Sequence, residues 1–185
     1  DTDGFTANVA RLGEITGCDV ARWDGYLEAL RRRRADFRAR GATATDHGHP
    51  SAATADLDPT TCQRLLDGAL AGTLGADDAE RFRGQLLVEM AAMSLDDGMV
   101  LQLHPGSRRN HSPRIHERFG RDQGADIPGR TDYVADLRPL LDRFGLEPDL
   151  RIILFTLDES TYARELAPLA GFYPCLTLGP PWWFF

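Results

Sequence analysis

Residues 99–110 read MVLQLHPGSRRN, and this stretch carries the strongest indication of the class of fold. Residues 99–103 are apolar apart from one glutamine, a pattern typical of a strand buried in the core of a sheet. The run ends at His104, after which a proline and a glycine turn the chain toward a pair of arginines. In α/β folds, sites lie just past the carboxyl ends of parallel strands. The stretch therefore predicts a core strand that delivers polar side chains to a site.

The segment that follows, residues 104–121, is basic although the chain as a whole is acidic. The 185-residue chain has a formal net charge of −7, whereas this segment holds five arginines and one glutamate. The arginines are Arg108, Arg109, Arg114, Arg118 and Arg121. A positive pocket in a negative protein suits a small anion better than a polyanion. A second arginine run, residues 31–34, has no interleaved aromatic residues and is interpreted as a solvated helix face, so we expect no nucleic-acid partner.

The overall composition predicts a folded globular protein that is not embedded in a membrane. No apolar run approaches the ~20 residues that a membrane-spanning helix needs, and the sequence does not begin like a secretory signal. Cys18, Cys62 and Cys175 are odd in number and lack C-x-x-C spacing, which favours free thiols in a reducing cytoplasm. The chain starts at Asp1 and ends on apolar aromatic residues, so we expect a piece of a longer protein.

Strand and helix patterns alternate along most of the chain. The candidate strands are residues 42–46, 99–103, 150–157 and 174–178, with helical spacing of apolar residues between them. Such alternation favours parallel strands joined by right-handed crossover helices. A doubly wound sheet is an alternative, although no glycine-rich phosphate loop follows any strand. We expect one α/β segment over residues 1–185, with helices over 1–41 and alternating strands and helices over 42–185.

Several local signals predict where helices begin and end. Asp24 and Asp58 are expected N-caps, the latter followed by a proline at the first helical position. Thr131 or Asp132 is expected to cap a helix that Pro139 kinks or splits. Residues 120–129 are rich in turn formers and are expected to be irregular.

A second polar cluster, DHGH at residues 46–49, follows the candidate strand 42–46. His-x-His at a strand end directs both imidazoles to one side, so His47 and His49 could form a metal pair. The alternative is two loop histidines, and the residues alone leave both interpretations open.

Three stretches together resemble the uronate isomerase (glucuronate isomerase) family of the amidohydrolase superfamily. They are RADFRARGATATDHGH at residues 34–49, LQLHPGSRRNHSPRIHERFGRDQGADIPG at 101–129, and FTLDESTYARELAPLAGFYPCLTLGPPWWFF at 155–185. The pairing of LH-x-G-x-x-RN with a later G-x-x-WWF is specific to that family. The resemblance implies part of a (β/α)8 TIM barrel, approximately strands four to seven. It also implies a cytoplasmic enzyme of carbohydrate metabolism, in pentose and glucuronate interconversion.

The activity that the resemblance implies is aldose–ketose isomerisation of uronates by proton transfer between C1 and C2. D-Glucuronate would be converted to D-fructuronate, and D-galacturonate to D-tagaturonate. By resemblance, Asp46 and His104 are catalytic, with His104 beside a divalent metal such as Zn²⁺. Arg109 is expected to bind the substrate, and Trp182 and Trp183 are candidates for the wall of the sugar pocket.

The same resemblance places the family's His-x-His metal pair upstream of residue 1 and its strand-eight aspartate downstream of residue 185. His47 and His49 sit at the strand-four position and are therefore not taken as that pair. We expect the isolated chain to be inactive and to self-associate through open sheet edges and an exposed apolar face. The residues expected on that face are Leu101, Leu103, Ile153 and Phe155. Alternative functions are a non-catalytic binding or assembly module derived from the barrel, and a metal-dependent hydrolase of the same superfamily.

Overall fold

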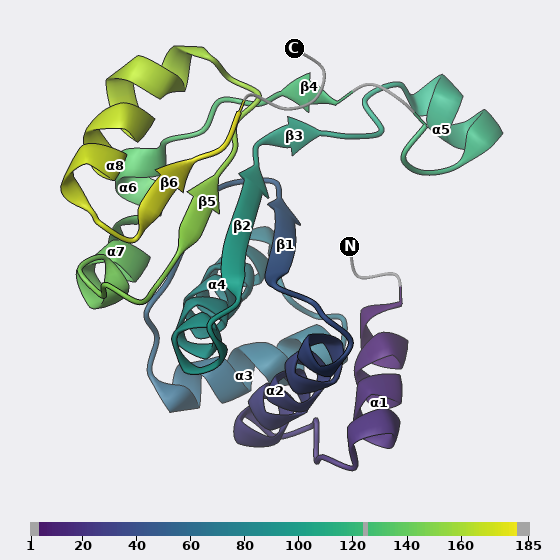
Figure 1. Ribbon diagram of the computed structural model, residues 1–185. Helices are drawn as coiled ribbons and strands as arrows, with labels where there is room; N and C mark the ends of the chain where they lie inside the picture. Colours follow the sequence, from purple (N-terminus) through teal and green to yellow (C-terminus); the bar gives the residue numbers. More distant parts are fainter. Residues whose placement is uncertain (1–3, 124–125, 181–185) are drawn as a thin grey trace. The chain divides into compact units, whose positions relative to one another are not determined.

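The computed structural model describes residues 4–123 and 126–180, and its contacts divide the chain into two compact units (Figure 1). The helical unit comprises Asp1–Thr43 and Ala53–Met99, and the sheet unit comprises Ala44–Ala52 and Val100–Phe185. The predicted single segment, with helices over 1–41 and alternation over 42–185, stays a prediction, because compactness does not test which parts fold together.

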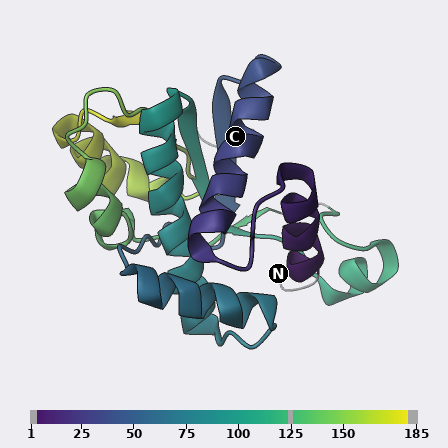
Figure 2. The same cartoon turned by 90° about the horizontal axis from the view of Figure 1, so that it is seen from below.

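The helical unit holds four helices (Figure 2). They are α1 (Phe5–Thr16), α2 (Trp23–Ala39), α3 (Pro59–Leu70) and α4 (Ala76–Asp97). Its interior is formed by aromatic and aliphatic side chains that recur at helical spacing. Trp23, Tyr26, Leu65, Leu66 and Val88 are among the buried residues. None of the helices in the described part of the chain is long and apolar enough to cross a membrane.

The predicted N-cap of α3 is confirmed and that of α2 is wrong. The Asp58 carboxylate accepts hydrogen bonds from the N–H groups of Thr60 and Thr61, each at 3.0 Å. In α2, Arg22 takes the N-cap position and Asp24 lies in the first turn. The N–H of Trp23 donates instead to Gln63 Oε1 at 2.7 Å. A distant glutamine thus satisfies a helix donor that a local cap would otherwise serve.

An ion pair links α2 to the end of α4. The Arg34 guanidinium donates to both carboxylate oxygens of Asp97, at 2.6 and 2.9 Å, and also to Ser94 Oγ at 3.0 Å. The two ionic side chains are only 7% and 16% exposed. Arg34 therefore is not part of a solvated face, unlike the interpretation of residues 31–34 from sequence, because its partner lies far away along the chain.

The sheet unit is built on four parallel strands, as the alternation predicts. They are β1 (Ala44–His49), β2 (Val100–Pro105), β5 (Ile152–Leu154) and β6 (Leu176–Leu178). Their order in the sheet, β1-β2-β5-β6, is also their order in the chain, and every pair is parallel. The described sheet lacks the reversal of strand order that defines a doubly wound fold. Within it, β1 and β6 are the edge strands.

The helices of this unit are short. They are α5 (Pro113–Phe119), α6 (Tyr133–Asp136), α7 (Arg138–Phe144), the π-helix η1 (Tyr162–Leu166) and α8 (Ala167–Phe172). Pro139 lies in the first turn of α7, next to the break between α6 and α7, which confirms the predicted split. Asp132 caps α6 by accepting from Ala135 N–H at 3.0 Å.

Strand β1 is longer at its carboxyl end than predicted. It continues through His47 and His49, where Gly48 pairs with His104 in β2. Because the neighbouring strand supplies backbone partners, this stretch is extended despite its turn-forming composition. His47 and His49 are therefore strand residues, so the loop interpretation is wrong.

The predicted exposure of apolar strand residues is wrong for β2. Leu101 is 0% and Leu103 3% exposed. Burial alternates along β2, so that Gln102 and His104 lie on its less buried face.

Residues 107–123 and 126–128, called the arm below, contain the helix α5 where the sequence suggested only a loop (Figure 1). Residues 120–123 and 126 form no helix or strand, in agreement with the irregular stretch predicted for 120–129, of which only 127–128 are a short strand. The base of the arm is an antiparallel pair of β3 (Ser107–Arg108) and β4 (Ile127–Pro128), and its tip is α5. Helix α5 begins at a Ser112 cap followed by Pro113, a start signal that the sequence contains. None of the α5 residues is buried.

Candidate functional site

Asp46 and His104 meet across neighbouring strands, as expected of residues that share a site. In the parallel register, His104 of β2 lies opposite Gly48 of β1, two residues beyond Asp46. Residues two apart share a face of a strand, so Asp46 is on the face toward which His104 also projects. The Asp46 Oδ1 atom contacts Nδ1 of His104. The Asp46 side chain is 67% exposed and that of His104 only 9%.

The surroundings of His104 hold its imidazole toward the neutral form. Burial lowers the pKa of His104, and the nearby charge and hydrogen bond of Asp46 oppose this effect without cancelling it. A neutral imidazole has one donor and one acceptor nitrogen, so it can both take up and release a proton. The pair therefore has the elements needed for acid–base chemistry.

Two further residues complete the same row across the sheet. Phe155 directly follows β5, and its ring centroid lies 4.1 Å from that of the His104 imidazole. Gly179 directly follows β6 and donates its N–H to Leu154 O at 2.9 Å. Sequence reasoning placed Phe155 only on an exposed apolar face. Its position one residue past a core strand was the signal that could have placed it at the site.

The two histidines of β1 lie on the face of that strand opposite to Asp46. His47 and His49 alternate with Asp46, and their ring centroids are 6.3 Å apart. Across residues 4–123 and 126–180, no group of three or more His, Cys, Asp or Glu side chains is arranged to hold a metal. The described residues therefore do not by themselves form a metal centre, whether around the two histidines or around His104.

Arg109 lies in the arm, where it contacts carboxylates of the arm itself. Its Nε donates to Asp126 Oδ1 at 2.9 Å, and Nη1 lies 3.7 Å from Asp122 Oδ1. The Arg109 side chain is 47% exposed, and Ser107 Oγ also donates to Asp126. These contacts do not join Arg109 to Asp46 or His104.

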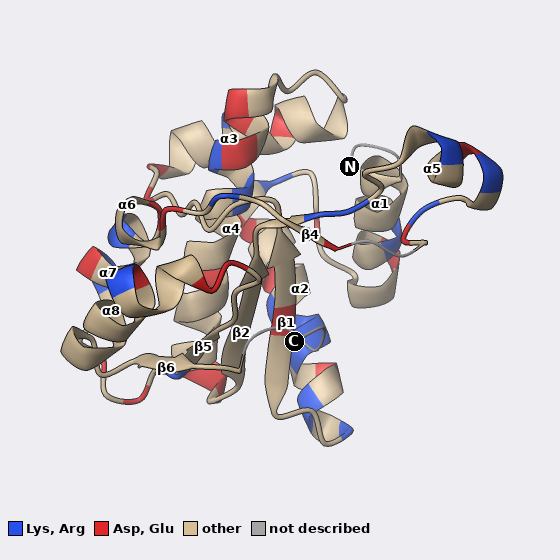
Figure 3. Cartoon of the chain, turned by 90° about the horizontal axis from the view of Figure 1, so that it is seen from above, with Lys and Arg blue, Asp and Glu red and all other residues tan. Residues whose placement is uncertain are grey.

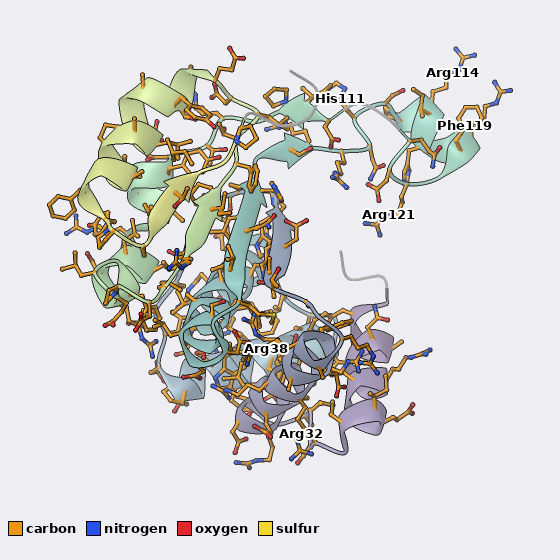
Figure 4. All side chains as sticks on the ribbon, in the orientation of Figure 1. Arg32, Arg38, His111, Arg114, Phe119 and Arg121 are labelled. Carbon is orange, nitrogen blue, oxygen red and sulfur yellow. The ribbon has the colours of Figure 1, made fainter. Side chains whose placement is uncertain are left out.

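The remaining arginines of the arm are spread over an exposed surface rather than a closed pocket. Figure 3 shows the concentration of basic residues in the arm, with acidic residues close by. In Figure 4, Arg114 and Phe119 project away from α5. The expected anion site is thus an open basic surface in this structure. The other predicted substrate contacts, Trp182 and Trp183, lie outside the described residues.

A parallel sheet whose strands follow one another in chain order, with an aspartate–histidine contact at their carboxyl ends, defines an α/β protein with a candidate site at that end of the sheet. A family model described as glucuronate isomerase matches residues 1–185, and the chain belongs to this family.

Individual relatives agree with the family match. The chain is 62% identical to the uronate isomerase of Mesorhizobium japonicum, of which it covers 39% with its whole length. It is 63% identical over 97% of its length to the enzyme of that name from Xanthomonas oryzae pv. oryzae, covering 38% of it. The chain therefore spans about two fifths of the length of these relatives.

Two solved structures share the fold. The glucuronate isomerase from Caulobacter crescentus is 57% identical, with a TM-score of 0.91 over 95% of this chain and 37% of its own. The uronate isomerase from Thermotoga maritima is 27% identical, with the same TM-score of 0.91 over 100% of this chain and 41% of its own.

Proposed function

We propose that the protein carrying this chain is a uronate isomerase that interconverts aldose and ketose uronates by moving a proton between C1 and C2. Its substrates would be D-glucuronate and D-galacturonate, with D-fructuronate and D-tagaturonate as the products. The observation that carries the proposal is the family match over residues 1–185, joined to an acid–base pair at the carboxyl ends of the strands. The sequential strand order supports a (β/α)8 barrel, of which these would be approximately strands four to seven.

In this proposal His104 handles the proton and Asp46 orients it. A side chain that moves a proton from carbon must lie within hydrogen-bond reach of it and have a pKa near the working pH. The lowered pKa of His104 keeps the imidazole neutral at physiological pH, where it can act as a base. The Asp46 carboxylate at Nδ1 fixes the tautomer that leaves Nε2 as the acceptor.

Arg109 is proposed to bind the substrate carboxylate. A guanidinium has five N–H donors in a planar fork, and the two aspartates of the arm engage only part of it. Its half-exposed position lets an added carboxylate approach without prior unfolding of the arm. Trp182 and Trp183 are proposed as the wall of the sugar pocket, because the family resemblance assigns them that place.

A divalent metal such as Zn²⁺, with His104 beside it, belongs to the proposal for the complete enzyme only. The described residues do not supply a ligand set, so we derive no step through a metal. The three cysteines are free, which supports a cytoplasmic enzyme. The edge positions of β1 and β6 in the described sheet support self-association of the isolated chain, because an edge strand is where a further strand can pair.

The test replaces His104 by asparagine in the full-length protein, with His116→Asn in the exposed helix α5 as the matched control. Conversion of D-glucuronate is followed by a coupled dehydrogenase assay. We expect a loss of about 10²- to 10⁴-fold in kcat/KM for His104→Asn, the usual contribution of a general acid–base, and no loss in the control. The melting temperature of His104→Asn should change little.

Other outcomes would contradict the proposal in distinct ways. Near-normal activity with a large drop in melting temperature would make His104 a core histidine. A folded wild-type protein that converts neither uronate would favour the non-catalytic module. Hydrolysis of an ester or lactone in place of isomerisation would favour the hydrolase.

A further inference from the structure

One row of residues crosses all four strands at their carboxyl ends. Gly48 pairs with His104 in the register of β1 and β2. Leu103 pairs with Leu154, and Leu154 with Leu178, so the next residues along are His104, Phe155 and Gly179. The row therefore reads glycine, histidine, phenylalanine, glycine, with two large rings between two residues that have no side chain.

Gly179 is needed in this row for space rather than for backbone conformation. A Cβ atom built on Gly179 would lie 2.4–2.8 Å from three atoms of the Phe155 ring, closer than real Cβ contacts come. Its φ angle is not among the positive values that favour glycine. The Gly179 backbone is also fixed, since its N–H donates to Leu154 O and its carbonyl accepts from the Tyr162 hydroxyl. The Phe155 ring thus occupies the volume that a side chain at position 179 would fill.

The backbone of Phe155 is held from two sides. Its N–H donates to Leu103 O in β2 at 3.0 Å, and its carbonyl accepts from the Tyr133 hydroxyl at 3.0 Å. Tyr133 is itself fully buried, and its own N–H donates to the buried carboxylate of Glu165 at 2.8 Å. The main chain of Phe155 is therefore fixed, and its ring can leave His104 only by rotating about its own side-chain bonds.

The His104 imidazole is therefore contacted in two places, by Asp46 at the edge of the ring and by Phe155 against its face. The edge contact comes from Oδ1 of Asp46, whose side chain is 67% exposed. The face contact comes from Phe155 at 4.1 Å with an interplanar angle of 42°. This centroid separation is shorter than the ~4.5–7 Å usual for aromatic pairs, so rotation of the imidazole is blocked on that side.

We propose that Phe155 is a positioning residue that holds the His104 imidazole in its working orientation. Its ring packs against Gly179, where a side chain would displace it. Phe155 acts through His104, and the functional part of the proposal rests on the catalytic role proposed above for that histidine. Misplacing a reacting group by about 1 Å can slow catalysis by about 100-fold, so the contact bears directly on rate.

The experiment is a double-variant cycle of Gly179→Ala and Phe155→Leu in the full-length protein. Gly179→Ala pushes the ring toward the imidazole and should lower kcat about 10- to 100-fold with KM nearly unchanged. Phe155→Leu removes the ring and should lower kcat about 10-fold by the same loss of orientation. In the double variant the added methyl no longer meets a ring, so it should lose no more than Phe155→Leu alone.

Matched controls and a spectroscopic readout separate positioning from general stability. Gly171 in α8 has open space where a Cβ would lie, and Phe172 is 70% exposed, so Gly171→Ala and Phe172→Leu should leave kcat unchanged. Histidine labelled with ¹³C at the ε1 position reports the ring current of Phe155 on His104, with the signal assigned by its loss in His104→Asn. We expect that signal to move downfield in Phe155→Leu and to stay in place in both controls.

Additive kcat losses in the cycle, or an unmoved His104 signal in Phe155→Leu, would overturn the proposal. A fall in melting temperature for Gly179→Ala with normal kinetics and an unmoved signal would also overturn it, because the glycine would then serve packing alone. If the wild-type protein converts no uronate, the proposed function fails, whereas the histidine signal still tests the contact.

Discussion

The pair Arg34–Asp97 in the helical unit and the pair Arg109–Asp126 in the arm have the same chemistry in different surroundings. In the first, both side chains are nearly buried, and the guanidinium donates to both oxygens of one carboxylate and to Ser94. In the second, the arginine is 47% exposed and contacts the carboxylate through one nitrogen. The first arginine is closed off from solvent, whereas the second is exposed enough for the substrate carboxylate proposed above to reach it. Burial, rather than charge, separates a structural arginine from a candidate binding arginine.

The largest effect expected from this comparison is on stability, at Arg34. Removing one member of a buried pair leaves the other charged without compensation, so Arg34→Ala should lower the free energy of unfolding by about 3–5 kcal/mol. Urea unfolding of the full-length protein measures this. The control is Arg138→Ala in the exposed Arg138–Asp142 pair, which should change stability by less than about 1 kcal/mol. Equal effects of the two substitutions would show that burial does not distinguish these pairs.

Arg109→Lys should give the opposite combination, a loss of activity without a loss of stability. Lysine keeps the charge but lacks the planar fork, and the loss of a charged hydrogen bond should lower kcat/KM for D-glucuronate about 10- to 1000-fold. The free energy of unfolding should change by less than about 1 kcal/mol, because the pair is half exposed. Wild-type kinetics in this variant would remove Arg109 from the binding site.

The smallest expected effect is a dependence of the free energy of unfolding on pH, caused by Asp97 of the buried Arg34–Asp97 pair. Burial raises the pKa of Asp97, but hydrogen bonds from Arg34 and Met99 N–H, together with the charges of Arg34 and Arg38, outweigh it and leave the pKa below its ordinary value. A carboxyl whose pKa is lower in the folded state stabilises the protein above its unfolded pKa, near 3.9, and loses this contribution as the pH falls through the folded pKa.

The measurement compares urea unfolding of wild type and Asp97→Asn between about pH 6 and pH 3. We expect the difference in stability to be constant above about pH 5 and to shrink below about pH 4, where the Asp97 carboxyl of the unfolded chain takes up a proton before that of the folded protein does. A difference that does not vary with pH over this range would mean that the carboxyl's charge contributes nothing.

Local signals in the sequence predicted much of the fold. The cap at Asp58 and the split at Pro139 follow from residues next to each other in the chain, and the parallel strands follow from the alternation of strand and helix patterns along it. The signals failed where a distant partner decides the outcome. Strand β1 extends past Asp46 because β2 supplies its hydrogen bonds, and α2 starts one residue before Asp24 because Gln63 serves its first donor.

The candidate site was predictable in part for the same reason. Asp46 and His104 could be named from their places at strand ends and from the family resemblance, and the structure brings their side chains into contact. Phe155 could have been placed at the site from its position one residue past a strand, but its contact with Gly179 could not, because that contact depends on the register of β2, β5 and β6. The arm was missed because its glycines and arginines suggested a loop, although Ser112 and Pro113 are a normal helix start.

The arm also bears on how the family can change over evolutionary time. It occupies about half of the connection between β2 and β5, residues 106–151, and its helix buries none of its residues. Halving or doubling a connection alters the closure entropy by only about 0.6 kcal/mol. Insertions, deletions and changes of charge there are expected to leave the sheet nearly as stable as before, while they alter the surroundings of Arg109, the residue proposed to bind the substrate. Relatives that prefer different sugar acids are therefore expected to diverge first in this arm, in length as well as in sequence.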